Sequence, residues 1–393
     1  MTAVEIPSEK SDVQGIEFCL NVVTKEAKGE SKLASQIIHT MLSGYTNDPI
    51  NLAINSPSGE GKSYVLHKVG DLFPSEDIMF VAGMTDKALF HRPGRLVIKN
   101  EIGEYESIEE TIAKIDSEIE DKESEIAITK DTNLKQARQN QVKELQKQKN
   151  DLRKDARKLI DLSHKIIVFQ DTPNPGLLIA LMPLLSHDKY EVEYEFVDTF
   201  NGIKTKTNVL RGWPAVICSQ AIDYSHYQRY PEIQRRFIIT NPKMNSEKYS
   251  AAVTLTGEKY GLPHFAYQRE VISDSEKETA RNIIKEIKSS ISLLYDRLEP
   301  GKNNVIIPFY EAVAQALPAD RARDMTTAKR LFSLMSLSAL IHVNKRPRYI
   351  FREEGHALMQ TIPYVTFEDL KESMSFIEFA GAADGVRQYI VEW

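Results

Sequence analysis

The chain has 393 residues, 41% hydrophobic and 27% charged, which is typical of a folded protein with two or three domains and excludes disordered and fibrous classes. A net charge of −6 argues against a uniformly basic nucleic-acid binder, although a few local cations can still bind DNA. Cys19 and Cys218 have aliphatic neighbours, so neither a disulfide framework nor a thiolate metal site is expected. The polar amino terminus and the lack of an apolar run of about 20 residues predict a cytoplasmic protein with no membrane partner.

The first hundred residues are expected to alternate between helix and strand. The apolar periodicity predicts helices over 32–43, 63–72 and 86–90 and strands over 50–55, 78–82 and 95–98. This alternation is typical of an α/β core.

A glycine-rich loop joins the first of these strands to the next helix. Ser-Pro-Ser-Gly-Glu-Gly-Lys-Ser matches the phosphate-binding P-loop, except that Ser56 stands where the first glycine usually lies. Gly59 and Gly61 would let backbone N–H groups face the phosphates, Lys62 would contact the β- and γ-phosphates, and Ser63 would ligate Mg²⁺. A chance Gly-Lys-Ser turn is the alternative, and the flanking strand and helix argue against it. ATP and Mg²⁺ are therefore expected to be held by Ser56, Pro57, Ser58, Gly59, Glu60, Gly61, Lys62, Ser63 and Tyr64.

A charged segment then interrupts the core. A first helix is predicted by the capping box Ser107-Ile-Glu-Glu110 and by heptad spacing of Ile108, Ile112, Ile115, Ile119 and Ile126. A second is predicted by Val142, Leu145, Leu152 and Leu159. The first helix is mostly acidic and the second mostly basic, so we expect an antiparallel coiled-coil hairpin. This arm is either a solvated spacer or a docking site for a protein partner.

Two later strands end in polar residues. The apolar run 166–169 is followed by Asp171, the only acid there, which would be either the metal-side aspartate or the water-orienting carboxylate of a P-loop site. A cap of the turn that follows is the structural alternative for Asp171. The strand over 215–218 leads to Ser219 and Gln220, which would contact the γ-phosphate or simply satisfy the end of the strand.

A β-hairpin is expected between these two strands. Residues on both sides of Asn201-Gly202 alternate at period two, which favours a tight turn there. Such a turn places Lys204 and Lys206 on one face with Glu193 and Glu195, and the apolar side chains on the other. The lysines would bind nucleic-acid phosphates or pair with these glutamates.

The remainder of the chain contains an arginine pair and several helices. Arg235 and Arg236 are expected to begin a further strand, and they are either surface residues or an arginine finger that acts on a neighbouring subunit. Helices are expected over 279–297, 309–317, 326–343 and 367–379, with a hairpin over 348–361. The last helices and the hairpin suggest a winged-helix element.

The order of P-loop, acidic strand end, hairpin, polar strand end, arginine pair and helical lid resembles the AAA+ ATPases over about residues 30–300. The branch it resembles has a hairpin before the sensor-1 strand and includes minichromosome-maintenance and superfamily 3 viral helicases and related phage, plasmid and archaeal replication ATPases. The resemblance implies that Gly59, Gly61, Lys62 and Ser63 form Walker A, Asp171 Walker B, Ser219 or Gln220 sensor 1, and Arg236, or secondarily Arg235, the arginine finger. Arg281, Lys329 and Arg330 are candidates for sensor 2. The resemblance also implies that the hairpin binds nucleic acid in the channel of a ring, most simply a homohexamer.

The expected fold is therefore an α/β AAA+ P-loop core with a parallel sheet, a coiled-coil insertion, a pre-sensor hairpin, a helical lid and a C-terminal winged helix. Its parts are an N-terminal segment 1–45, core segments 46–104 and 163–270 with the hairpin at 190–211, the insertion 105–162, the lid 271–300 and the C-terminal region 301–393. The expected function is that of an ATP-dependent helicase or translocase on single-stranded or forked DNA in replication. The alternative is a AAA+ ATPase switch that assembles on DNA or remodels a protein partner without unwinding.

Overall fold

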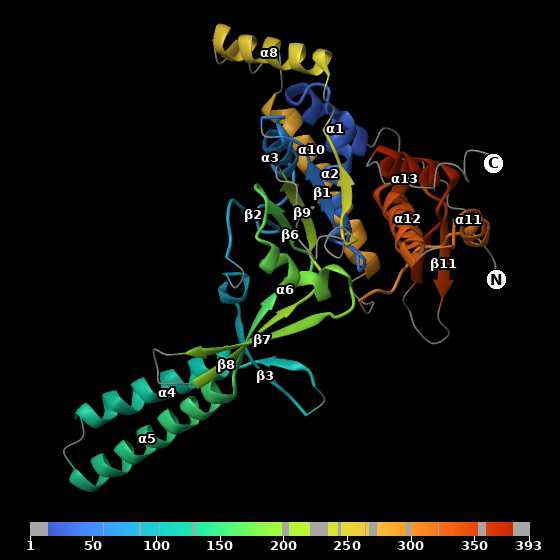
Figure 1. Cartoon of the computed structure of the whole chain (residues 1–393). Helices are drawn as coiled ribbons and strands as arrows, with labels where there is room; N and C mark the ends of the chain where they lie inside the picture. The colour runs from blue at the N-terminus through green and yellow to red at the C-terminus, as the bar shows by residue number, and fades with distance from the viewer. Residues whose placement is uncertain are drawn as a thin grey trace. The chain divides into compact units, whose positions relative to one another are not determined.

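The protein is an α/β protein with two five-stranded sheets that belong to two compact units (Figure 1). The computed structural model describes residues 15–57, 59–85, 88–101, 103–128, 131–198, 204–220, 235–242, 245–263, 265–266, 273–295, 300–320, 322–352 and 359–379. The P-loop unit comprises Met1–Asp86, Ser163–Tyr190 and Trp213–Trp393, and the insertion unit comprises Lys87–Leu162 and Glu191–Gly212. Within the described part of the chain, no helix is both long and apolar enough to cross a membrane.

The sheet of the P-loop unit is entirely parallel, as expected. Its strands are β1 (Leu52–Asn55), β2 (Ile78–Val81), β6 (Ile166–Phe169), β9 (Ala215–Gln220) and β10 (Ile238–Thr240). Their order is β10-β1-β9-β6-β2. Every residue of β6 is buried, which explains its unbroken apolar run, because a central parallel strand is covered on both faces.

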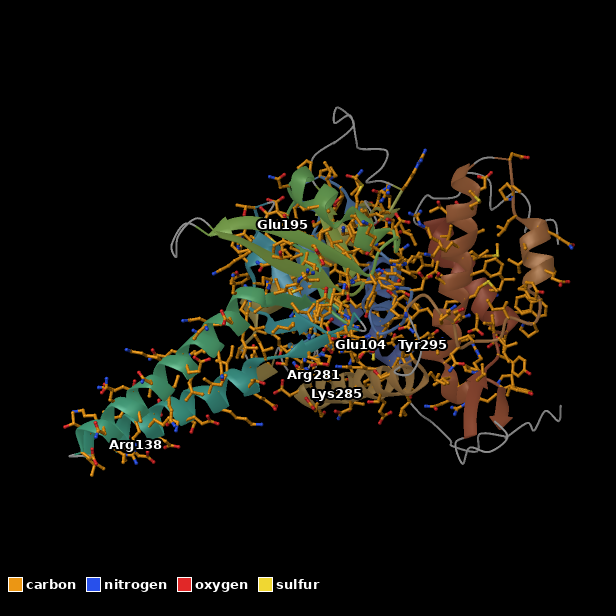
Figure 2. All side chains as sticks on the ribbon, turned by 90° about the horizontal axis from the view of Figure 1, so that it is seen from below. Glu104, Arg138, Glu195, Arg281, Lys285 and Tyr295 are labelled. Atoms are coloured by element: carbon orange, nitrogen blue, oxygen red, sulfur yellow. The ribbon has the colours of Figure 1, made fainter. Side chains whose placement is uncertain are left out.

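Helices complete the core of this unit. They are α1 (Ile16–Glu26), α2 (Ser31–Ser43), α3 (Lys62–Gly70), α6 (Pro175–Leu185), α8 (Ser246–Gly261) and α10 (Asp274–Tyr295). The second half of α2 is buried all round, and α10 buries a stripe of isoleucines that includes Ile284 and Ile291. The opposite side of α10 is polar and carries Arg281 and Lys285 (Figure 2). Helices α1, α2, α3, α8 and α10 therefore share one continuous apolar core with the sheet.

The sheet of the insertion unit is mixed and was not predicted as a whole. Its strands are β3 (Arg95–Lys99), β4 (Tyr105–Ser107), β5 (Arg157–Asp161), β7 (Glu191–Asp198) and β8 (Lys204–Arg211), in the order β4-β3-β5-β8-β7. Only β5 and β8 are parallel among its pairs. The strand expected at 95–98 therefore forms, but in this sheet. Leu159, expected on a helical seam, instead lies in β5 and packs with Val97 and Val209.

The expected antiparallel helical arm is confirmed. It consists of α4 (Glu109–Ile128) and α5 (Thr132–Asp155), which lie side by side in Figure 1. Lys149 pairs with Asp116, and Arg138, labelled near the end of the arm in Figure 2, lies 3.1 Å from Glu125. Helix α4 begins at Glu109, so the predicted helix start at Ser107 is wrong, because that serine is the last residue of β4.

The register of the β7–β8 hairpin differs from the expected one by a single residue. Asp198 lies opposite Lys204, and Phe196 lies opposite Lys206, whereas a two-residue turn at Asn201-Gly202 would shift each partner by one. Residues 199–203, and so that turn, lie outside the described residues. Directly opposed residues share a face, and a one-residue shift moves a whole strand's side chains to the other face. The predicted face of Lys206 is therefore wrong: Lys206 shares its face with Tyr194 and Phe196 instead of the two glutamates. The Lys204 side chain lies outside the described residues.

The C-terminal elements form where expected. They are α11 (Tyr310–Ala316), α12 (Ala322–Ile341), β11 (Arg348–Arg352), β12 (Met359–Pro363) and α13 (Phe367–Phe379). Two arginines at the β11–β12 hairpin, one before β11 and one at its start, form hydrogen bonds within this region. Arg346 donates to both oxygens of the buried Asp369, and Arg348 donates to Val343 O over 3.0 Å. These two side chains thus stabilise the region.

A cluster of ionisable groups joins α13 to α2 and α12. His39 Nε2 lies 3.0 Å from Glu372 Oε1, and His342 Nε2 lies 3.3 Å from Glu372 Oε2. Burial opposes the charge of Glu372, but hydrogen bonds from both histidines and Ser338 hold its pKa well below the usual range. Burial also opposes the positive charge of His39. The pKa of His39 is nevertheless raised above its usual value, mainly by the hydrogen bond to Glu372 and the negative charge of Glu372, and further by the backbone of Ser35 and the charge of Glu17. The cluster therefore favours a charged pair between α2 and α13.

Candidate nucleotide-binding site

The glycine-rich loop runs from the end of β1 to the start of α3. Gly59 has φ +91° and Gly61 has φ +79°, both in the left-handed region that side chains with a Cβ rarely adopt. Gly61 is the N-cap of α3 and makes no side-chain cap, so the first N–H groups of the helix are left to face a ligand. Ser63 and Tyr64 are exposed in that first turn, and Ser58 lies outside the described residues. The loop therefore has the backbone geometry of an anion site.

Lys62 closes over the start of this loop. Its ammonium group donates to the carbonyl oxygen of Ser56 and, over 3.0 Å, to that of Pro57. Burial lowers the pKa of Lys62, and the negative charges of Glu60 and Asp171 act in the opposite direction. Asp171 therefore lies within electrostatic range of the P-loop lysine, although more than a hundred residues separate them in the sequence.

The end of β6 carries a neutral side chain and then the acid. The Gln170 side-chain amide hydrogen-bonds His67 Nε2 over 2.8 Å, and the His67 ring stacks on Phe80 with centroids 4.7 Å apart. Asp171 is exposed and accepts the N–H of Thr172 over 2.7 Å, so it also caps the turn. Helix α3 thus contacts Gln170, which no pattern in the sequence predicts, while the Asp171 side chain is exposed to solvent.

These groups fit a magnesium ion that is bound mainly through phosphates. The described residues contain no cluster of three or more His, Cys, Asp or Glu that could hold a metal alone. Mg²⁺ usually keeps several waters and is bound through one or two carboxylates plus substrate phosphates. The exposed Ser63 hydroxyl and Asp171 carboxylate would supply the protein's share.

Strand β9 lies between the loop strand and the acid strand. Ile54 pairs with Ser219 and Asn55 with Gln220, so β1 and β9 end at the same edge of the sheet. The Ser219 side chain is buried, with 3% exposed, and the side chain of Gln220 lies outside the described part of the chain. With β9 between them, β1 and β6 are about 10 Å apart, which leaves room for a phosphate group between the loop and Asp171.

The arginine pair lies at the other edge of the same sheet. Ile238 pairs with Leu52, so the segment holding Arg235 and Arg236 precedes the amino end of β10. By this register Arg236 lies beside the residue five positions before the end of β1. The Arg236 backbone is therefore about 16 Å from the carboxyl end of β1, where the loop begins. Arg235 is exposed and Arg236 half-buried. The structure therefore does not bring this pair to the P-loop of its own chain.

None of the three sensor-2 candidates lies at the loop. Arg281 Nε donates over 2.9 Å to Asp71 O, at the far end of α3, and Lys329 lies 3.2 Å from Asp48, before β1. Arg330 donates to main-chain carbonyls beside the arginine pair.

Helix α8 instead supplies the cation that contacts the loop. Lys248 Nζ donates to Glu60 O over 3.0 Å, and the Tyr249 hydroxyl donates to the Glu60 carboxylate over 3.0 Å. Lys248 also lies 2.5 Å from the buried Glu30, between α1 and α2. The only signal in the sequence is that Lys248 is an early cation after the last strand of the parallel sheet, and nothing in the sequence links it to Glu60.

The nucleic-acid candidates belong to the insertion unit. Lys206 is exposed and lies on the aromatic face of the hairpin, opposite Phe196, whereas the Lys204 side chain is outside the described part. Phe196 is 5.1 Å from the ring of His91, and Tyr194 is 4.5 Å from that of Phe90. This face therefore combines a cation with partly exposed rings.

No protein-family model matches the chain, and no curated protein is significantly similar to it in sequence. Inferences about its function therefore rest on the residues and geometry described above.

Proposed function

We propose that this protein is a AAA+ ATPase that forms a ring and translocates on or unwinds single-stranded or forked DNA. The observation that carries the proposal is the arrangement at one edge of the parallel sheet: the glycine loop after β1, Asp171 after β6 and the polar end of β9 between them. Ligands of open α/β sheets bind at the carboxyl ends of the strands, which is the edge where these groups meet.

Each group at this edge has a role in the proposed reaction. The loop N–H groups and Lys62 would bind the phosphates, and bound MgATP would supply the phosphoryl group that is transferred to water. Ser63 would contact the metal ion. Asp171 would bind the water shell of the metal ion or orient the attacking water, because its carboxylate is exposed at this edge and acts electrostatically on Lys62.

The position of Arg235 and Arg236 supports a ring. Because they lie at the opposite edge from the P-loop, a catalytic arginine here would have to act on the nucleotide of a neighbouring subunit. A heterologous interface of this kind generates a closed ring when the rotation between subunits closes. We favour a hexamer as the simplest ring for this class.

The hairpin supports the choice of single-stranded DNA. Base stacking on aromatic rings contributes about 1–3 kcal/mol per base, and cations bind the backbone without sequence preference. Phe196 and Lys206 share one face and would provide these two kinds of contact.

The first test is ATP hydrolysis in the presence of Mg²⁺, with and without single-stranded DNA. Lys62→Ala should abolish turnover, because it removes the cation that stabilises charge on the transferred group. A folded Lys62→Ala variant with wild-type turnover would refute an ATPase at this loop.

The second test concerns the hairpin. Lys206→Ala should reduce DNA-stimulated hydrolysis and fork unwinding, and lower the log–log salt slope of binding by up to about 0.7 per phosphate contact. Glu195→Ala, on the opposite face of the same hairpin (Glu195 is labelled in Figure 2), is the matched control and should leave DNA binding intact. Equal DNA responses in both variants would exclude this face as the DNA contact.

The alternative is a AAA+ switch that binds DNA or a protein partner without unwinding. It would be favoured if the wild-type protein hydrolyses ATP but does not separate a fork. The exposed Ile128 and Leu134 near the end of the arm are the natural positions at which to test protein docking.

A further inference from the structure

We infer that Arg330, on α12 of the C-terminal region, is a positioning residue that holds Arg236 in place for catalysis on a neighbouring subunit. The inference rests on the proposed function, since it assigns a role to Arg330 in the same ATPase site. The role concerns the side of the subunit interface that would supply Arg236 to the neighbouring nucleotide, which is the opposite side from the chain's own P-loop.

Arg330 hydrogen-bonds the backbone on both sides of Arg236. One guanidinium nitrogen of Arg330, Nη2, donates to the carbonyl oxygen of Arg235 over 2.5 Å and to that of Phe237 over 3.0 Å. These carbonyls belong to the residues on either side of Arg236. The Arg235 carbonyl belongs to the peptide that leads into Arg236, and the Phe237 carbonyl belongs to the peptide between Phe237 and Ile238. The two hydrogen bonds therefore restrain the backbone on both sides of Arg236, and with it the direction in which the Arg236 side chain leaves the backbone.

The sheet itself does not supply this restraint. The first main-chain bond that joins β10 to β1 in this region is from Ile238 N to Asn51 O, 2.8 Å, so the arginine pair lies just outside the ladder. A segment that precedes a strand needs other partners for its carbonyl groups. Arg330 provides them from a helix almost a hundred residues further along the chain.

The use of an arginine here is costly, which argues for a specific role. Burial lowers the pKa of the Arg330 guanidinium to about 10, because the charge is removed from water. Both hydrogen bonds described for this group go to main-chain carbonyls, so the charge is compensated by dipoles. A planar guanidinium can reach two carbonyls in a fixed geometry, which a flexible ammonium group does less well.

Helix α12 is itself anchored beside this contact. One turn of the helix also binds Asp48, which precedes β1: Lys329 Nζ lies 3.2 Å from Asp48, and Ser333 donates to its other oxygen. Arg330 therefore projects from a helix that is fixed to the amino edge of the same sheet. This makes Lys329 a matched control, because it is the neighbouring cation and helps to hold α12 without contacting the arginine pair.

The experiment compares variants alone and in mixtures. Arg330→Met keeps an unbranched aliphatic stem and removes both hydrogen bonds. Alone, it should bind a fluorescent ATP analogue as wild type does, yet lose about a hundredfold in turnover, since a displacement of about 1 Å can cost that much. Lys329→Met should retain wild-type turnover.

Mixing identifies the side of the interface that is damaged. Equal amounts of Arg330→Met and Lys62→Ala protein should regain activity, with about a quarter of the interfaces carrying both wild-type elements in a randomly mixed ring. Arg330→Met mixed with Arg236→Ala should regain none, because both lack the same donor. A purely structural defect would damage both sides of the subunit and prevent recovery with Lys62→Ala.

The outcomes separate this inference from the proposed function. If Arg236→Ala and Lys62→Ala fail to complement each other, the shared site between subunits is refuted. If that pair complements and Arg330→Met with Lys62→Ala does not, only the positioning role is refuted. Should Arg330→Met fail to fold, Arg330→Lys in the same mixtures decides: partial turnover, restored by Lys62→Ala, supports the role, and full turnover alone overturns it.

Discussion

Replacing Lys248 with methionine is expected to have two effects that can be measured separately: a loss of stability and a loss of nucleotide affinity. The Lys248 side chain is 9% exposed and that of Glu30 is 4% exposed, with their charged atoms 2.5 Å apart. Both oxygens of Glu30 are buried without a well-aligned hydrogen-bond donor, so the ammonium charge compensates that carboxylate. Methionine fills the same space and leaves the carboxylate unpaired.

The loss of stability follows from the buried Glu30 carboxylate, which the substitution leaves without a cationic partner. Removing one partner of a buried ion pair costs about 3–5 kcal/mol, whereas replacing both partners by neutral groups is often close to neutral. Lys248→Met should therefore lower the free energy of unfolding in urea by about 3–5 kcal/mol. Glu30→Gln combined with Lys248→Met should recover most of that loss.

The loss of affinity should persist in the double variant. Lys248 also donates to Glu60 O, and this bond restrains the loop backbone between Gly59 and Gly61, whose N–H groups would face the phosphates. A hydrogen bond to a charged group contributes about 1.5–3 kcal/mol, so the dissociation constant for an ATP analogue should rise about tenfold or more.

Lys28→Met is the control for both measurements. Lys28 lies 3.8 Å from Glu258, also on α8, but both of these side chains are well exposed. Its loss should cost less than about 1 kcal/mol and leave nucleotide affinity unchanged. A Lys248→Met variant as stable as Lys28→Met would refute the buried pair, and an unchanged affinity in the double variant would refute the tether to the loop.

Three further outcomes are expected. The pKa of His39 is raised above 6.5 and that of Glu372 lowered below 4.5, so the stabilisation from this pair is complete between those values and is lost as the pH rises through the raised value. The melting temperature should therefore fall as the pH rises above 6.5, and fall less in His39→Gln. Asp369→Asn should cost about 3–5 kcal/mol in urea unfolding because its arginine partner is buried, whereas Glu368→Gln, at the exposed side of that arginine, should cost less than about 1 kcal/mol. Asp171→Asn should reduce ATP turnover by about a hundredfold or more in a steady-state assay, with little change in nucleotide affinity.

Local patterns in the sequence were sufficient for the loop and its flanking elements. The strand before Ser56, the helix after Gly61 and the apolar run before Asp171 each depend on residues close together in the chain, and all three were predicted. The parallel sheet followed from the same runs, since a strand covered on both faces must be apolar throughout. The identity of the bound nucleotide and the action on DNA stay predictions.

Features that depend on distant parts of the chain were missed. The heptad spacing that runs through Leu152 continues to Leu159, so periodicity alone could not show that the helix gives way to β5. The face of Lys206 depended on a one-residue difference in register, which alternating side chains cannot reveal. The contacts of Lys248 with Glu60 and of Arg330 with Arg235 join segments that only folding brings together.

The way in which the helical arm joins its sheet has a consequence for how such a chain can gain or lose length. Ser107, before α4, and Arg157, after α5, both pair with Val97 of β3, from opposite sides. The arm thus leaves and returns at points about 10 Å apart, a gap that a short turn can span. The arm can therefore be inserted, lengthened or deleted at this position without altering the strand pairs of the sheet that carries it.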